Sequence, residues 1–225
     1  MISIKNVSKH YGKQKVLAGI NLTIEKGKVY GIVGKNGAGK TTLFRCLADI
    51  ETYDGSIDSD YIDLKNHIGL LETNPVLLSR ITGWEYLKLL TKARKVEVND
   101  FEIQNIFDLP LDQYAETYST GMKKKLALTA ILLQKNEVFI LDEPFSGVDI
   151  QSNILITAII EELRRKDKVV LISSHIFSSL SAICDKIFLL DKGVIEKEVS
   201  KEDYARLEAE LVKDIVKDKI GDLQL

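Results

Sequence analysis

Hydrophobic and polar residues follow one another along the chain with either the two-residue period of a strand or the 3.6-residue period of a helix. The segment "ISIKNV" alternates like a strand, and "VLAGINLTIEKG" predicts a second strand pair with a turn at Glu25–Gly27. "YDGSIDS" indicates a turn between edge strands. Further strands, several of them continuous apolar runs typical of buried positions, are expected in "KVYGIVG", "NHIGLLE", "EVFILDEP", "KVVLISSH", "KIFLLDKG" and "VIEKEVS".

Segments with the helical period separate these strands. Thr82 lies three residues before Glu85 and predicts a capping box, and Ser200 with Asp203 predicts a cap for the last helix. Helices are expected from Lys40 to about Asp49, in "ITGWEYLKLLTKARK", from Ser119 to about Gln134, in "VDIQSNILITAIIEELRRK", from Ile176 to Ile183 and from Lys201. The last helix is expected to pack on the core through one face, formed by Tyr204, Leu207, Leu211 and Ile215.

The order of the elements predicts an α/β fold. Because strands alternate with helices, the sheet is expected to be mainly parallel and covered on both faces. The span 73–136 is mostly helical and interrupts this alternation. We therefore expect a single domain whose core is formed by residues 1–72 and 137–225 and includes an antiparallel β subdomain. A helical subdomain, residues 73–136, is expected to be inserted into that core.

Composition and charge limit the functions that are open to the chain. Its 225 residues are 45% hydrophobic and 28% charged, which allows a sizeable core. The formal net charge of -2 argues against a protein that coats nucleic acid, so no nucleic-acid partner is expected. Cys46 and Cys184 lie far apart and predict two buried thiols in a reducing compartment.

No segment predicts secretion or a membrane span. The N-terminus "MISIKNVSKHYG" lacks an apolar core of signal-peptide length. The apolar runs "LALTAILL" and "ILITAII" are shorter than the ~20 residues that cross a bilayer. The chain is therefore expected to be cytoplasmic, and a role at a membrane would require another protein that crosses it.

The segment "GKNGAGKT", from Gly34 to Thr41, fits the phosphate-binding pattern G-x-x-x-x-G-K-[ST]. It follows an apolar strand and opens a helix, which is the context that the pattern requires. Lys40 is expected to reach the β- and γ-phosphates of a nucleotide, Thr41 to ligate Mg²⁺, and Thr42 to donate to the α-phosphate. The predicted nucleotide-binding residues of this segment are Gly34, Lys35, Asn36, Gly37, Ala38, Gly39, Lys40, Thr41 and Thr42.

A second part of the site is expected where the apolar strand 138–141 ends in Asp142 and Glu143. The C-terminal ends of parallel strands face the ligand, so Asp142 would hold Mg²⁺ through a water beside the phosphate loop. Burial of two adjacent carboxylates at a strand end is unfavourable, and it indicates that a cation compensates for the charge and that both groups have a chemical function. Glu143 is therefore the expected base, and His175, at the end of "VVLISSH", is expected to hold Glu143 and the attacking water in place.

With these residues in this order, the chain resembles the ATP-binding-cassette ATPases, the motor subunits of ABC transporters. The resemblance covers the whole chain and implies a P-loop NTPase core, with Tyr11 stacked on adenine. It rests on the phosphate loop at 34–41, the signature "YSTGM" at 118–122, the acidic strand at 138–143, the D-loop "SGVD" that ends in Asp149, and the switch residue His175.

The resemblance also implies that two cassettes pair head to tail with ATP between them. The trans-acting signature residues of one copy, Ser119, Thr120, Gly121 and Met122, would face the phosphate loop of the other copy. Ser119 would cap its helix or donate to the γ-phosphate, and Gly121 would let the backbone approach. The pair would be formed by two copies of this chain or by this chain and a homologous cassette.

Three lysines directly follow the signature. At the positive end of a helix, each cation weakens an isolated helix by about 0.3–1 kcal/mol, but an incoming anion makes the same arrangement favourable. Consecutive helical residues point about 100° apart. We therefore expect Lys123 to lie near the partner's ATP, and Lys124 and Lys125 to face solvent.

The chain departs from the family's usual motifs at three positions. Thr120 and Met122 stand where Gly and Gln are usual, a variant that resembles bacterial cassettes serving export-type permeases. The family's glutamine between core and helical subdomain corresponds to Glu72 in "IGLLETNP". Glu72 is thus a further candidate Mg²⁺ ligand, because a carboxylate can bind a hard cation.

The function implied by the resemblance is ATP hydrolysis coupled to transport. ATP-driven dimerisation would power a separate integral-membrane permease, expected to be an exporter, with the chain peripheral on the inner face of the membrane. The permease is expected to bind near Glu72–Tyr86. Three other classes stay open: a soluble cassette acting on ribosomes or DNA, a P-loop kinase, and a regulatory subunit that binds nucleotide without hydrolysing it.

Overall fold

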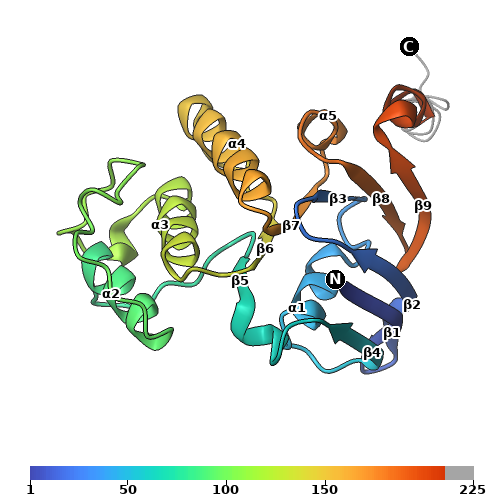
Figure 1. Ribbon diagram of the computed structural model, residues 1–225, viewed down its shortest axis with the longest axis horizontal. Coiled ribbons are helices and arrows are strands. Elements are labelled where there is room, and N and C mark those ends of the chain that lie inside the picture. Colours follow the sequence, from blue (N-terminus) through green and yellow to red (C-terminus); the bar gives the residue numbers. More distant parts are fainter. Residues whose placement is uncertain (211–225) are drawn as a thin grey trace, which may run out of the picture.

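A six-stranded sheet forms the centre of the molecule, for which a computed structural model describes residues 1–210 (Figure 1). Its strand order is β5-β6-β7-β3-β8-β9, and every neighbouring pair is parallel except β8 with β9. The strands are β3 (Val29–Val33), β5 (Ile68–Leu71), β6 (Val138–Asp142), β7 (Val169–Ser174), β8 (Lys186–Asp191) and β9 (Val194–Ser200). The predicted α/β fold with a mainly parallel sheet is confirmed.

A second, antiparallel sheet of three strands has the order β2-β1-β4. Its strands are β1 (Ile2–Tyr11), β2 (Gln14–Ile24) and β4 (Asp54–Ser59). The turn predicted at "YDGSIDS" is wrong, because most of this segment is β4, in which Ile57 pairs with Ile4 of β1. Pairing with β1 and the partial burial of Ile57 outweigh the low strand propensity of Asp, Gly and Ser.

Helices and short 3₁₀ turns connect the strands. They are α1 (Lys40–Leu47), η1 (Leu64–His67), α2 (Gly83–Ala93), η2 (Ala115–Thr117), α3 (Thr120–Leu133), α4 (Ile150–Arg165), α5 (Phe177–Ser181) and η3 (Lys201–Asp203). In residues 1–210, none of these is long and apolar enough to cross a membrane. The predicted cap at Ser200 is wrong: residues 201–203 form a 3₁₀ turn, and the Ser200 side chain makes no capping hydrogen bond.

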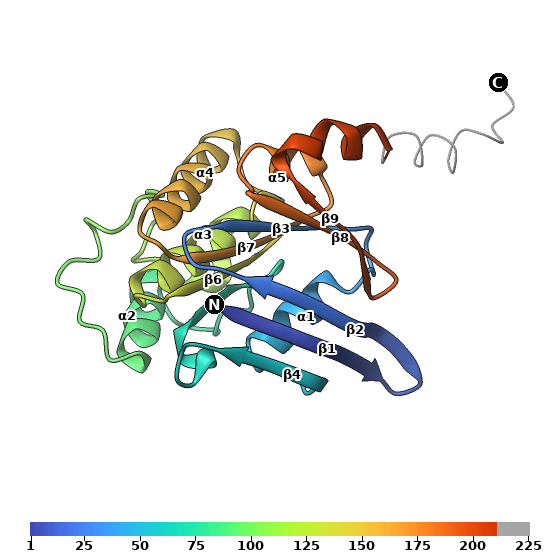
Figure 2. The same ribbon diagram turned by 45° about the vertical axis from the view of Figure 1, so that its right-hand side comes forward.

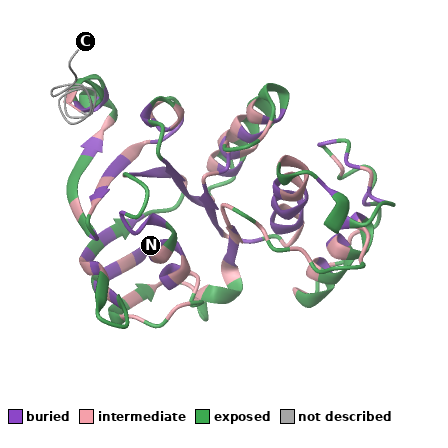
Figure 3. Cartoon of the chain, turned by 180° about the vertical axis from the view of Figure 1, so that it is seen from behind, coloured by how far each residue is buried: buried purple, intermediate pink, exposed green. Residues whose placement is uncertain are grey.

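The central sheet separates two apolar clusters because neighbouring residues of each strand point to opposite faces. Along β6, Phe139 and Leu141 belong to the cluster with α3, α4 and α5, whereas Val138 and Ile140 belong to the cluster with α1 and the antiparallel sheet. Figure 2 shows the antiparallel sheet and α1 together on one side. In Figure 3 the buried positions concentrate along the central strands and the inner faces of the helices.

The last described residues and the two cysteines belong to this core. Tyr204 and Leu207 are buried, as predicted, and residues 204–210 are helical. Leu211 and Ile215, predicted on the same face, lie outside the described residues. Cys46 and Cys184 are buried free thiols, and burial raises the pKa of Cys46 to about 11.

The segment 73–136 is less helical than predicted. Only α2, η2 and α3 are helical, and most of the chain between α2 and η2 forms turns and irregular loops. Short polar side chains hold these loops: Asp100 accepts from the backbone N–H of Glu102, and Asn105 bonds both backbone groups of Leu109. Such bonds compete with helix formation. The division into core and inserted subdomain stays a prediction.

The capping box of α2 provides a test of local stability. Thr82 Oγ1 accepts from Glu85 N at 3.2 Å, and Glu85 Oε2 accepts from Thr82 N at 2.8 Å. We expect Thr82→Ala to lower the free energy of unfolding by about 1 kcal/mol, since it leaves the N–H of Glu85 without its side-chain acceptor. Urea denaturation measures the change. Thr82→Ser, which keeps the hydroxyl, should match the parent; equal stability of the Ala variant would contradict the role of the cap.

Candidate nucleotide site

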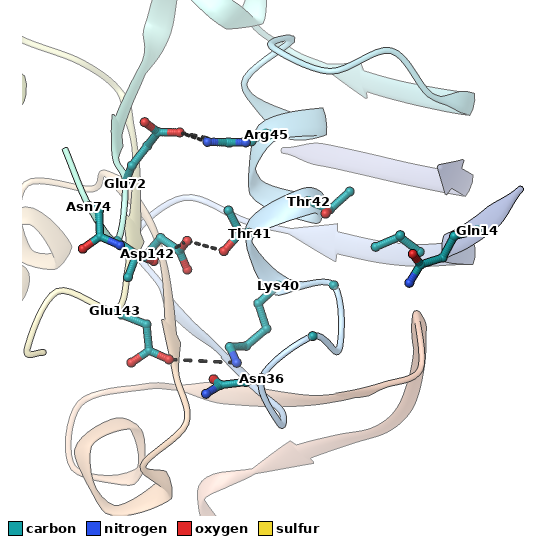
Figure 4. A pocket seen from close by; sticks show the side chains of 14 residues that line it. Gln14, Asn36, Lys40, Thr41, Thr42, Arg45, Glu72, Asn74, Asp142 and Glu143 are labelled. Carbon is teal, nitrogen blue, oxygen red and sulfur yellow. Dashed lines mark hydrogen bonds and ion pairs between the residues drawn. The ribbon is translucent and has the colours of Figure 1, made fainter. Parts of the chain in front are cut away.

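A pocket of about 560 Å³ opens between the start of α1 and the C-terminal ends of β5 and β6 (Figure 4). Of the residues predicted to bind nucleotide, Asn36, Gly37, Gly39, Lys40, Thr41 and Thr42 line it. Asp142, Glu143 and Glu72 line it as well. Gly34, Lys35 and Ala38 complete the loop without lining the pocket.

The glycines of the loop serve different purposes. A Cβ at Gly34 would lie 2.3 Å from the carbonyl oxygen of Leu190, so Gly34 allows the loop to pack on β8. Gly37 and Gly39 have φ of +83° and +110°, a region that favours glycine. A Cβ at Gly37 would meet no atom within 4 Å, so its backbone borders open space. A close approach of the backbone to phosphates is therefore possible at Gly37, whereas Gly34 is required for internal packing.

Lys40 points across the mouth of the loop. Its ammonium donates to the carbonyl oxygens of Gly34 at 2.7 Å and Lys35 at 3.3 Å, and lies 3.9 Å from Glu143 Oε1. Only 7% of the residue is exposed, and this burial lowers its pKa, against the opposing effect of Glu143 and Asp142. The cation is thus held at the place where a bound triphosphate would need it.

Asp142 ends β6 and is 1% exposed. Its Oδ2 accepts from Thr41 Oγ1 at 2.6 Å and from Thr73 Oγ1 at 2.8 Å, and its Oδ1 accepts from Ser173. Mg²⁺ in nucleotide sites is held by one or two such hard oxygen ligands together with phosphates. The paired Thr41 and Asp142 fit that ion and would hold it at the phosphates.

Glu143 follows Asp142 in a left-handed conformation, φ +51°, which is unusual for a residue with a side chain. Its backbone N–H donates to Ser173 Oγ at 3.0 Å, and its carboxylate Oε2 lies 3.0 Å from His175 Nδ1. The two residues predicted to be catalytic, which directly follow β6 and β7, therefore lie in contact. The Glu143 side chain is 11% exposed and the His175 side chain is 48% exposed.

Glu72 lines the pocket but is paired with Arg45, and its role as a Mg²⁺ ligand stays a prediction. The Arg45 guanidinium donates twice to Glu72 Oε1, at 3.0 and 2.7 Å, and turns this carboxylate toward α1 and away from Asp142 (Figure 4). The next residue, Thr73, donates a hydrogen bond to Asp142 Oδ2 at 2.8 Å. Glu72 was predicted because it stands where the family has a glutamine, whereas Thr73, the second residue after β5, was not predicted.

Tyr11 is 43% exposed and does not line the pocket. It pairs across the β1–β2 turn with Gln14, which does line it, as does Val16. The Lys9 ammonium lies 4.9 Å from the centre of the Tyr11 ring. Burial raises the pKa of the Tyr11 phenol, and a hydrogen bond with the Glu51 carboxylate raises it further. Stacking of Tyr11 on a base stays a prediction, and Gln14 and Val16 are pocket residues that the sequence did not reveal.

The signature residues lie outside this pocket, at the start of α3. Ser119 Oγ accepts from the backbone N–H of Met122 at 3.2 Å, so the predicted cap is confirmed. Ser119 and Thr120 are exposed. A Cβ at Gly121 would lie 2.7 Å from the carbonyl oxygen of Gly147. Close packing of α3 against the backbone of Gly147 therefore requires a glycine at this position, independently of any contact with a partner.

The prediction that two of the three lysines face solvent is wrong. Lys124 is 1% exposed, and its ammonium donates to the carbonyl oxygens of Glu143 and Ser146. Lys125 lies 3.3 Å from the carboxylate of Asp149, which also caps α4 by accepting from Ser152 N. Hydrogen bonds from the backbone and the side chain of Ser152 lower the pKa of the Asp149 carboxyl group, and Lys125 lowers it further. Angular spacing placed the lysines on different sides of α3 but could not show that the 143–149 loop covers two of those sides.

The strand order, the loop between β3 and α1, and the carboxylate at the end of β6 define a P-loop nucleotide-binding domain. A family model for ABC transporters matches residues 17–146. The chain therefore belongs to the ABC transporter family, as one of its ATPases.

Individual relatives agree with this family. The ABC transporter ATP-binding protein NatA of Bacillus subtilis is 34% identical over 219 residues, covering 87% of each chain. The lantibiotic transport ATP-binding protein SrtF of Streptococcus pyogenes is 32% identical over 213 residues, covering 88% of this chain and 91% of its own. A solved dimeric ATP-binding cassette in a post-hydrolysis state, bound to ADP and Pi, has the same fold, with a TM-score of 0.80, 20% identity and coverage of 89% and 99%.

The contact between Gly121 and Gly147 can be tested by substitution. We expect Gly121→Ala to lower the free energy of unfolding by about 1–3 kcal/mol, because the added methyl group forces α3 and the 147 backbone apart. Thermal or urea denaturation gives the value. The neighbouring exposed residue supplies the control, since Thr120→Ala adds no atom at this contact. If Gly121→Ala is as stable as the parent, the backbones of residues 121 and 147 are not in contact.

Proposed function

We propose that this chain hydrolyses ATP in a head-to-tail dimer of cassettes and that the cycle powers a separate integral-membrane permease. The contact between Glu143 and His175, beside the phosphate loop, carries the hydrolytic part of the proposal. A nucleotide-binding regulator would not need this pair, and a kinase would not need the signature. The chain would work in the cytoplasm, at the inner face of the membrane.

ATP binding would use the loop as it stands. The backbone N–H groups at the start of α1 and the buried Lys40 suit the β- and γ-phosphates, with Thr42 near the α-phosphate. Mg²⁺, when bound, neutralises charge on the phosphate oxygens, and Thr41 with Asp142 would hold it. Tyr11 or Val16 would contact the base.

Glu143 would take the proton from the attacking water. His175 would orient its carboxylate, and Ser173 Oγ accepts a hydrogen bond from the Glu143 backbone N–H. A base held by contacts on several sides needs little rearrangement in the transition state. Once the γ-phosphate leaves, the charge attraction between the two cassettes falls, and the dimer opens.

The second cassette would meet the first through the signature. Ser119 and Thr120 are exposed at the N-terminus of a fourteen-residue helix whose first N–H groups are suited to an anion. In this dimer Lys123 would lie near the partner's γ-phosphate, and Asp149 would lie beside the interface. The partner would be a second copy of this chain or a homologous cassette.

The permease would bind the loop that leads into α2. Val76 and Leu78 are 86% and 54% exposed there, and exposed apolar groups of this kind suit a protein interface. The rings of Trp84 and Phe101 pack edge-on with their centroids 5.9 Å apart, and Trp84 stays 39% exposed. Tyr86 packs against the apolar core, and burial raises its pKa to about 12. The signature variant with Thr120 and Met122 supports export as the direction.

Removal of the base tests the mechanism. We expect Glu143→Gln to bind Mg-ATP like the parent, to lose turnover by about 10²–10⁴-fold, and to accumulate as an ATP-dependent dimer. Phosphate release measures turnover, and light scattering coupled to size exclusion measures mass. Glu137→Gln, at the opposite end of β6 and paired with Lys168, is the control and should hydrolyse ATP normally. A Glu143→Gln chain that stays monomeric in ATP and keeps parental turnover would contradict the proposal.

A further inference from the structure

Lys124 is a buried cation in α3, and the nucleotide site described above does not use it. It lies in the second turn of α3, five residues after the cap at Ser119, and is 1% exposed. Its ammonium donates to the carbonyl oxygen of Glu143 at 2.8 Å and to that of Ser146 at 2.7 Å. Glu143 directly follows β6, and Ser146 is the first residue of the D-loop.

Burial of an ammonium group is unfavourable unless hydrogen bonds and opposite charge compensate for it. Desolvation lowers the pKa of Lys124, and the carboxylates of Glu143 and Asp142 oppose that shift. The cation therefore lies in the field of both acidic residues while bonding the backbone of one of them. An apolar side chain of the same length would fill the space without either interaction.

The contact acts on a backbone that is not in a relaxed conformation. Glu143 has φ +51°, which residues with a Cβ adopt only when their surroundings enforce it. Ser173 Oγ holds its N–H, His175 lies against its carboxylate, and Lys124 holds its carbonyl. Without the ammonium, the peptide between Glu143 and Pro144 would lose its donor, and the direction of the Glu143 side chain would no longer be fixed.

We propose that Lys124 is a positioning residue for Glu143. It holds the 143–146 turn so that the carboxylate points to His175 and to the phosphate loop. This inference rests on the proposed function of Glu143 as the base. It also means that α3, whose first turn would meet a partner's ATP, supports the base of its own chain through its second turn.

Substitution of Lys124 by residues of similar size tests the proposal. Lys124→Met keeps the volume and removes the donor; we expect kcat to fall by about 10²-fold, with KM and the calorimetric Kd for Mg-ATP unchanged. Lys124→Gln keeps a shorter donor that can bond one carbonyl, and we expect a smaller fall of about tenfold. We therefore expect kcat to be highest in the parent, lower in Lys124→Gln and lowest in Lys124→Met. Loss of packing alone would not produce this order.

The control removes a buried polar group from the same helix without touching the turn. Thr129 is 2% exposed and donates to the carbonyl of Lys125 at 2.9 Å. Thr129→Val should lower Tm and keep the parental kcat. A Lys124→Met chain with parental kcat would overturn the proposal, as would a Thr129→Val chain whose kcat falls as far as that of Lys124→Met. If Lys124→Met does not fold, Lys124→Gln alone decides: parental kcat in that variant would overturn it.

The Glu143→Gln variant separates this inference from the proposed function. With Glu143→Gln as the background, Lys124→Met should cause no further loss of turnover, because the group that it positions is already absent. Parental turnover in Glu143→Gln alone would reject the proposed function. Loss of turnover in Glu143→Gln together with normal kcat in Lys124→Met would reject only the role of Lys124.

Discussion

Two adjacent acidic residues at the C-terminal end of β6 determine how the rest of the site is arranged. Asp142 is almost fully buried and the Glu143 carboxylate is 11% exposed, so both charges require compensation. Lys40 approaches them from α1, and Lys124 approaches from α3. Buried cations, as well as apolar packing, therefore join the phosphate loop and the signature helix to the C-terminal end of β6.

Local signals in the sequence predicted the fold and the phosphate loop well. Continuous apolar runs identified β3, β6 and β7, since buried parallel strands need them, and the Thr82–Glu85 spacing identified a capping box because that contact spans a single turn. Contacts between distant segments could not be predicted. The polar strand β4 depends on pairing with β1, and the burial of Lys124 depends on a turn that follows it by about twenty residues in the chain.

The differences around the site share one cause. The position of the family's glutamine suggested Glu72 as a metal ligand, and helical spacing suggested that the last two lysines of the signature helix face solvent. In the structure, Arg45 engages Glu72, and the small polar residue Thr73 bonds Asp142 instead. Lys124 bonds backbone carbonyls, and Lys125 pairs with Asp149. The partner of a charged side chain is set by the tertiary fold, which residue type alone does not reveal.

A crystal structure of the full chain carrying Glu143→Gln, grown with Mg-ATP, would examine this charge arrangement most directly. We expect the triphosphate in the 34–41 loop, the Lys40 ammonium moved from the Gly34 carbonyl to the phosphates, and the metal at Thr41 and Asp142. Lys124 should still bond the carbonyls of residues 143 and 146. Phosphates bound away from Lys40, or a Lys124 side chain turned out to solvent, would contradict a site built on these buried charges.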